Sequence, residues 1–188
     1  MKLDGCEKRD TVILSLFQKF YDDLLNKDNC HSMTENQGAV ALVVADLGGG
    51  GSQRVVSAVA NAWAAEGRNV TVITIAGPES DHYSLAPPVR RFVLGGAGVT
   101  ASLIEALWEN LRRVIRLRRA LKETEVSTAL GFILPINVTL LLASLGLGIK
   151  VVLSERNDPA RQSFGRVWGA LRWFLYRFAG TITANSRA

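Results

Sequence analysis

The chain has 188 residues, of which 48% are hydrophobic and 21% are charged, and this balance excludes a disordered or collagen-like chain. Its length suits one α/β domain and is too short for two full domains. Residues 1–38 contain 5 basic and 7 acidic side chains, whereas residues 39–188 contain 17 basic and 10 acidic ones. This basic excess consists mostly of Arg, which predicts an anionic partner such as nucleic acid, anionic lipid or a phosphorylated ligand.

Residues 1–37 are expected to form an N-terminal extension. Four apolar residues at a spacing of four predict an amphipathic helix within it. These residues are Val12, Leu16, Phe20 and Leu24. The alternative is a mis-assigned start, with translation beginning at Met33. The only cysteines, Cys6 and Cys30, also lie here, and the first residues do not have the pattern of a signal peptide. We therefore expect reduced thiols in the cytoplasm.

The domain itself is expected to span residues 38–188. Short runs rich in apolar and β-branched residues predict strands that are buried on both faces of a sheet. These runs are Ala39–Ala45, Asn69–Ile75, Val89–Leu94, Val126–Phe132, Ile149–Ser154 and Thr181–Ala184. Helical spacing predicts helices at Ser52–Glu66, Ala101–Glu123, Ile136–Leu145 and Ser163–Phe178. This alternation predicts a single α/β domain with a Rossmann-like, doubly wound parallel sheet.

One stretch, Val126–Ile149, contains no charged residue and is close to the ~20 residues that cross a bilayer. Gly131, Pro135 and Asn137 interrupt it. We therefore interpret it as a strand, a buried helix and the entry to the next strand, rather than as a transmembrane helix.

The glycine loop, Gly48–Gly51, is the strongest indication of a binding site. It joins the first predicted strand to the first predicted helix. Glycine lets a ligand approach the backbone closely, and a helix N-terminus presents N–H groups to an anion. We expect Ser52 to cap this helix. The residues assigned to substrate binding are Gly49, Gly50, Gly51, Ser52 and Arg54. The alternative is a tight turn that binds nothing.

Gln53 argues against two familiar nucleotide-binding motifs. It stands where glycine precedes Lys-Ser/Thr in a P-loop, and also where the third glycine of the dinucleotide fingerprint would stand. The acidic residue that would bind the ribose of NAD is missing, because Ile75-Ala76-Gly77 ends the second predicted strand. We expect no metal and no organic cofactor, since no His, Cys and carboxylate cluster has ligand spacing.

The helix Ala101–Glu123 is predicted to have a basic face. Arg112, Arg116 and Arg119 share this face. The expected core face lies opposite and consists of Leu103, Leu107, Val114 and Leu121. We predict that the basic face lies on an anionic membrane surface. The alternative is a solvated face. Nucleic acid is disfavoured because the chain lacks a recognisable nucleic-acid-binding motif.

The helix Ser163–Phe178 is predicted to contribute to the same surface. Trp173 and Arg177 fall opposite a core face that includes Leu171, Leu175 and Phe178. A solvent-facing Trp beside Arg suits a membrane interface. Packing against a neighbouring element is the alternative.

Three segments, in this order, resemble family 4 glycosyltransferases, which have the two-domain GT-B fold. The first segment is GGGGSQRVVSAVANAWAAEGRNVTVITI at Gly48–Ile75. The others are VVLSERNDP at Val151–Pro159 and TITANSR at Thr181–Arg187. The resemblance covers residues 39–188 and is to the N-terminal, acceptor-side domain of that family.

The resemblance implies transfer of a sugar from a nucleotide sugar to a lipid-linked or other glycan acceptor, in cell-envelope polysaccharide or glycolipid synthesis. It also implies a retaining, metal-independent reaction at the inner face of the membrane. The donor-binding domain of the family is absent from this sequence, so we expect the chain alone to be inactive and to need a donor-binding subunit. Many family members have a central His, and Arg156 and Asp158 occupy that region here as weak catalytic candidates. The alternative is a non-catalytic, membrane-associated module that binds a phosphate ligand.

Overall fold

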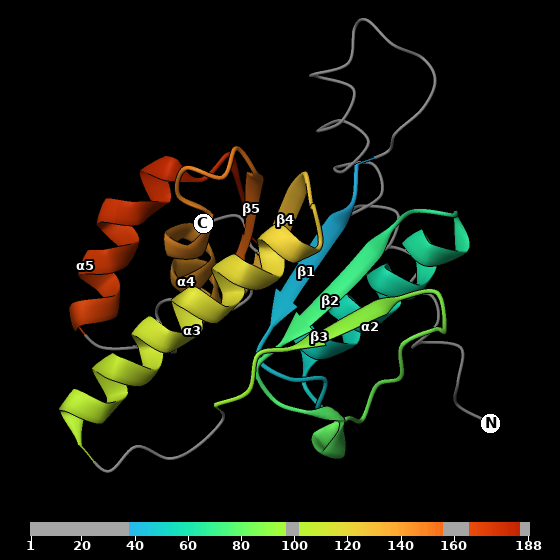
Figure 1. The fold of residues 1–188 in the computed structure, drawn as a ribbon, viewed down its shortest axis with the longest axis horizontal. Helices are drawn as coiled ribbons and strands as arrows, with labels where there is room; N and C mark the ends of the chain where they lie inside the picture. Colours follow the sequence, from blue (N-terminus) through green and yellow to red (C-terminus); the bar gives the residue numbers. More distant parts are fainter. Residues whose placement is uncertain (1–37, 97–101, 156–165, 185–188) are drawn as a thin grey trace, which may run out of the picture.

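The computed structural model describes residues 38–96, 102–155 and 166–184. They form a six-stranded parallel sheet with the order β3-β2-β1-β4-β5-β6 (Figure 1). The strands are β1 (Val40–Val44), β2 (Val70–Thr74), β3 (Arg90–Val93), β4 (Thr128–Phe132), β5 (Lys150–Glu155) and β6 (Thr181–Ala184). The helices are α2 (Gly51–Ala65), α3 (Leu103–Glu123), α4 (Leu134–Ser144) and α5 (Arg166–Leu175). Short 3-10 helices lie at Pro78–Ser80 and Tyr176–Phe178.

The predicted alternation of strands and helices is confirmed, and so is the Rossmann-like α/β fold class. The charge-free stretch forms β4, α4 and the entry to β5, as the sequence predicted. Within the described ranges, no helix has both the length and the apolar character needed to cross a membrane. The predicted extension, residues 1–37, lies outside the described residues.

The sheet separates two apolar layers. On one face, α2 packs on β1 and β2, and Trp63 is its largest fully buried side chain. On the other face, α4 packs between α3 and α5 (Figure 1). Neighbouring residues of β1 pack into opposite layers: Leu42 lies in the layer of α2, and Val43 lies in the layer of α3, α4 and α5. The continuous apolar runs in the sequence reflect this burial on both faces.

Gly131 explains the close fit of α4 against β4. A Cβ at this position would lie 2.5 Å from Asn137 Oδ1 and 3.1 Å from Leu140 Cδ2. Glycine within a strand often marks such an approach of another element. The packing of α4 on β4 therefore requires glycine at position 131.

The order of strands reverses between β1 and β4, because the chain leaves β1 for β2 and returns after β3 to pair β4 on the other side of β1. All carboxyl ends of the strands point to the same edge, since every pairing is parallel. In open α/β sheets, ligands bind beyond this edge at the switch point. The glycine loop follows β1 and therefore lies there.

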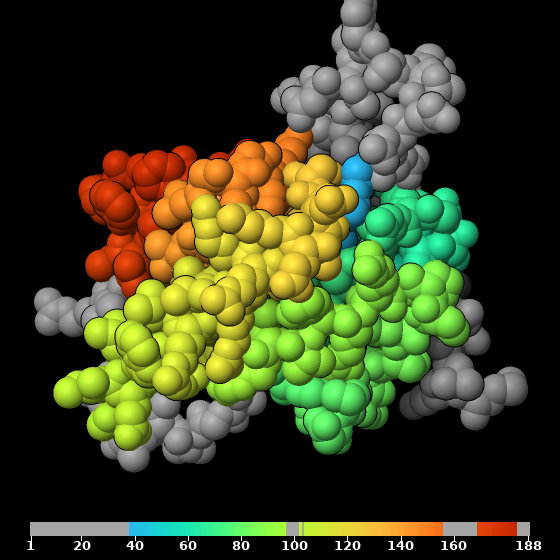
Figure 2. All heavy atoms as spheres, viewed as in Figure 1, coloured from blue at the N-terminus to red at the C-terminus, as the bar shows by residue number. Residues whose placement is uncertain are grey.

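The first half of α3 differs from the prediction. Leu107 was expected in the core but is 73% exposed, whereas Leu117 and Leu121 farther along the helix are buried. The reason is that α3 begins beyond the carboxyl edge of the sheet, so its first turns have no strand beneath them (Figure 1). Figure 2 shows this end of the helix protruding at the lower left.

The predicted core face of the last helix is confirmed at Leu175, which is buried, and wrong at Phe178, which is 54% exposed. The α-helix ends at Leu175, and residues 176–178 continue as a 3-10 helix. Phe178 ends this 3-10 helix, and its ring lies 6.2 Å from the ring of Phe174, which is also exposed.

Candidate functional site

The glycine loop is held in shape by its own neighbours. Asp46 Oδ1 accepts hydrogen bonds from the backbone N–H of Gly48 at 2.8 Å and from Gln53 Nε2 at 3.1 Å. The carbonyl of Leu47 accepts the backbone N–H groups of His82 at 2.8 Å and Tyr83 at 3.1 Å. These bonds fix the loop to the first turn of α2 and to the segment that follows β2.

Two glycines of this loop are not explained by packing. A Cβ at Gly49 or Gly51 would have no heavy atom within 4 Å, and neither residue has a positive φ. Both positions are exposed. The protein itself therefore has room for a side chain at each. A ligand that approaches the backbone at the start of α2 accounts for glycine there.

The predicted cap of α2 is wrong. The N-cap residue is Gly50, no side chain makes the cap hydrogen bond, and the helix begins at Gly51. Ser52 is the second helical residue, and its side chain is buried. Arg54 is half-buried one turn into the helix, where its backbone N–H bonds to the carbonyl of Gly50 at 3.1 Å. No side chain caps the start of α2, and this suits binding of a ligand by main-chain N–H groups there.

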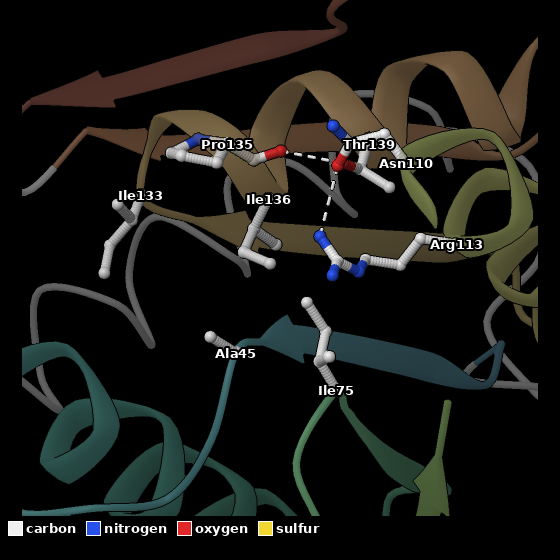
Figure 3. Close-up of a pocket in the computed structure, with 8 residues that line it drawn as sticks. All are labelled: Ala45, Ile75, Asn110, Arg113, Ile133, Pro135, Ile136 and Thr139. Carbon is white, nitrogen blue, oxygen red and sulfur yellow. Dashed lines mark hydrogen bonds between the residues drawn. The ribbon is translucent and has the colours of Figure 1, made fainter. Parts of the chain in front are cut away.

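A pocket of about 250 Å³ lies beside the switch point, between the ends of β1 and β2 on one side and α3 and α4 on the other (Figure 3). Its lining residues are Ala45, Ile75, Asn110, Arg113, Ile133, Pro135, Ile136 and Thr139. Sequence reasoning missed this pocket because the fold assembles it from separate segments, each of which resembles ordinary core.

Arg113 enters this pocket from α3, and its guanidinium reaches into the space between Ile136 and Ile75 (Figure 3). Its Nη1 donates to Asn110 Oδ1 at 3.2 Å and its Nη2 donates to the carbonyl of Gly96 at 3.0 Å. The Nε atom is buried and has no hydrogen-bond partner among the described residues. The sequence alone gave no reason to single out Arg113.

The arginines predicted for a membrane surface have different surroundings. Arg112 is 49% exposed, pairs with Glu109 at 2.7 Å and lies 5.2 Å from the ring centre of Trp108. Arg116 is half-buried and donates to the carbonyl of Leu94 at 3.4 Å. Arg119 is exposed.

The predicted aromatic site on α5 is exposed. Trp173 has 78% of its surface in solvent. The guanidinium of Arg177 lies 5.3 Å from the ring centre of Trp173 and 4.8 Å from that of Phe174. These contacts keep a cation and two aromatic rings together at the surface.

A buried polar cluster closes the end of β5. The hydroxyl of Tyr176 donates to Glu155 and accepts a hydrogen bond from Asn137 Nδ2 at 3.2 Å. Burial, reinforced by the bond to Glu155, raises the pKa of the Tyr176 phenol well above its ordinary value. Sequence reasoning missed this cluster because its members come from different elements. The catalytic candidates Arg156 and Asp158 lie outside the described residues.

A named relative and two solved structures resemble this chain. The relative is "GalNAc-alpha-(1->4)-GalNAc-alpha-(1->3)-diNAcBac-PP-undecaprenol alpha-1,4-N-acetyl-D-galactosaminyltransferase" of Campylobacter jejuni, which is 26% identical over 144 residues that cover 77% of this chain and 39% of the relative. MurG of Acinetobacter baumannii superposes with a TM-score of 0.58 at 20% identity, over 80% of this chain and 42% of MurG.

Sucrose-phosphate synthase of Thermosynechococcus elongatus superposes with a TM-score of 0.59 at 12% identity, over 78% of this chain and 42% of the synthase. The chain therefore spans about two fifths of the length of the proteins that it matches. The family model described as Glycosyltransferase Family 4 matches residues 49–188. The chain belongs to glycosyltransferase family 4, and its fold is that of the N-terminal domain of a GT-B enzyme.

Proposed function

We propose that this chain is the acceptor-side domain of a retaining, metal-independent glycosyltransferase. The enzyme transfers a sugar from a nucleotide sugar to a lipid-linked or other glycan acceptor, in the synthesis of a cell-envelope polysaccharide or glycolipid. Family membership supports the reaction class. The name of the relative, which describes transfer to an undecaprenol-linked saccharide, supports the acceptor class. A donor-binding domain, in the same chain or in a partner, completes the proposed enzyme.

The observation that carries this proposal is the open glycine loop at the carboxyl edge of the sheet. Gly49 and Gly51 leave space that no side chain of the described residues fills. The backbone N–H groups of Gly51 and Ser52 then stabilise the negative charge of the leaving diphosphate or orient the acceptor, aided by the positive end of the α2 dipole. The N–H of Gly50 donates within the loop, to the carbonyl of Gly48 at 2.9 Å. Arg54 adds positive charge one turn away. Arg156 and Asp158 remain candidates for a catalytic role.

The proposed location is the cytoplasmic face of a membrane, with the exposed half of α3 resting on it. An apolar stripe consists of Ile104, Leu107, Trp108, Leu111 and Ile115, which are between 44% and 82% exposed. Arg112 and Arg119 follow this stripe along one side of the helix. A helix with an apolar face and basic flanks lies in the headgroup region of an anionic bilayer. A second candidate contact consists of Trp173 on α5 and Arg177 in the 3-10 helix that follows it.

The experiment that tests the proposed function is a transfer assay with labelled nucleotide sugars and a lipid extract as the source of acceptors. The assay uses the chain together with a donor-binding domain of the family. We expect label to enter the organic phase with one donor of the panel. Binding of phosphate ligands and vesicles without transfer from any donor would instead favour the non-catalytic module.

A further inference from the structure

The pocket between α3 and α4 is mainly aliphatic. Five of its eight lining residues are Ala45, Ile75, Ile133, Pro135 and Ile136. Its volume of about 250 Å³ is below the ~300–1,000 Å³ of pockets that enclose a whole small ligand. The pocket therefore suits one apolar group of a larger ligand.

Arg113 brings a positive charge into these aliphatic surroundings. A half-buried charge is unfavourable unless an opposite charge or sufficient hydrogen bonds compensate for it. Among the described residues, Arg113 bonds only to the neutral oxygens of Asn110 and Gly96, and its Nε has no partner. A bound phosphate or carboxylate would supply the missing negative charge through charge-assisted hydrogen bonds.

The start of α4 adds to this preference for an anion. Pro135 and Ile136 belong to its first turn and line the pocket, so the positive end of the helix dipole lies close by. The cap residue Ile133 has a φ of 75°, which is unusual for a β-branched side chain. This conformation turns the chain directly from β4 into α4 at the wall of the pocket.

We infer that the pocket binds an amphiphilic anion. An aliphatic group lies against Ile75, Ile133 and Ile136, and the phosphate or carboxylate next to it bonds to Arg113. The inference rests on the proposed function and deepens it, because it assigns this chemistry to the acceptor at the same sheet edge as the glycine loop. A prenyl phosphate and a fatty acyl chain both have this chemistry.

The test is a titration of the full chain with geranyl phosphate, followed by NMR of the isoleucine methyl groups. The comparison probes are decyl phosphate, decanoate, geraniol and inorganic phosphate. We expect geranyl phosphate to shift the methyl signals of Ile75, Ile133 and Ile136, and to bind at least about tenfold more tightly than geraniol or inorganic phosphate. Tighter binding of geranyl phosphate than of decyl phosphate and decanoate supports a prenyl carrier, and the reverse supports an acyl chain.

Arg113→Gln should weaken binding of geranyl phosphate about tenfold or more. Arg118→Gln is the matched control, because Arg118 also lies on α3 and donates to main-chain carbonyls, those of Ala143 and Leu145 at the far end of α4. Ala45→Leu fills the pocket from its rim and should abolish the methyl shifts even if Arg113→Gln fails to fold. Unchanged affinity in Ala45→Leu, or equal affinity for geraniol and geranyl phosphate, would overturn the inference.

These measurements require no nucleotide sugar. Binding at the three isoleucines without any transfer activity would support the inferred binding pocket and refute the proposed function. Transfer activity without binding of any amphiphilic anion at these isoleucines would support the proposed function and refute the inferred binding pocket.

Discussion

Gln53 donates a hydrogen bond through its side-chain amide to the carboxylate of Asp46 at 3.1 Å, across the mouth of the glycine loop. The same carboxylate accepts the backbone N–H of Gly48. Gln53, which argues against a P-loop and a dinucleotide fingerprint, thus helps to hold the glycine loop in shape. These bonds within the protein fix the backbone of the loop, which positions its N–H groups for a ligand.

Asp46→Ala should destabilise the domain by about 1–2 kcal/mol, because it removes the acceptor of both bonds. Asp46→Asn retains an oxygen at this position and should destabilise the domain less. Urea denaturation of the two variants measures the difference. Equal stability of Asp46→Ala and the unmodified chain would show that these bonds do not hold the loop.

Gly49→Ala and Gly51→Ala should fold normally, since a Cβ at either position meets no heavy atom within 4 Å. Transfer activity should nevertheless fall at least about tenfold, because the added methyl occupies the space of the ligand. Gly169→Ala is the matched control, because Gly169 also has open space but lies in α5. Full activity of both loop variants would refute the proposed role of the glycine loop.

Gly131→Ala should lower the free energy of unfolding by about 1–3 kcal/mol, because the new Cβ would lie 2.5 Å from Asn137 Oδ1 and 3.4 Å from its Cα. Thermal unfolding followed by circular dichroism measures this loss. A melting temperature equal to that of the unmodified chain would show that α4 does not approach β4 as closely as described.

Tyr176→Phe should destabilise the domain by about 1–3 kcal/mol at neutral pH, since buried Glu155 loses its hydrogen-bond donor. The fold raises the pKa of Tyr176 above its ordinary value of 10.0, so it favours the neutral phenol. That stabilisation is fully present below pH 10 and is lost as the pH rises beyond it. Urea denaturation between pH 7 and 11 should show a steeper loss above pH 10 in the unmodified chain than in Tyr176→Phe, and parallel curves would contradict this.

Replacing Ile104, Leu107 and Leu111 together by Ser should reduce binding to phosphatidylglycerol vesicles at both low and high salt. Arg112→Gln and Arg119→Gln should each weaken it by about 1 kcal/mol, and only at low salt, because salt screens surface charges. Leu145→Ser is the control, since Leu145 is 45% exposed at the far end of α4. Vesicle sedimentation measures all of these variants. Undiminished binding of the triple variant would exclude α3 as the contact.

The sequence predicted the elements well because both layers of this sheet need apolar residues at regular spacing. The prediction failed where tertiary geometry decides, at Leu107 beyond the sheet edge and at Phe178 in a 3-10 helix. The glycine loop was found because its signal is local. The pocket at Arg113 and the cluster at Tyr176 were not found, since each is assembled from elements far apart in the chain.

The most direct test of the central claim compares transfer by this chain alone with transfer by the chain mixed with a donor-binding domain, over the same panel of nucleotide sugars. An acceptor-side domain predicts transfer only in the mixture, with loss of that activity in Gly49→Ala and Gly51→Ala. Transfer by the 188-residue chain alone, at the rate of the mixture, would contradict the claim.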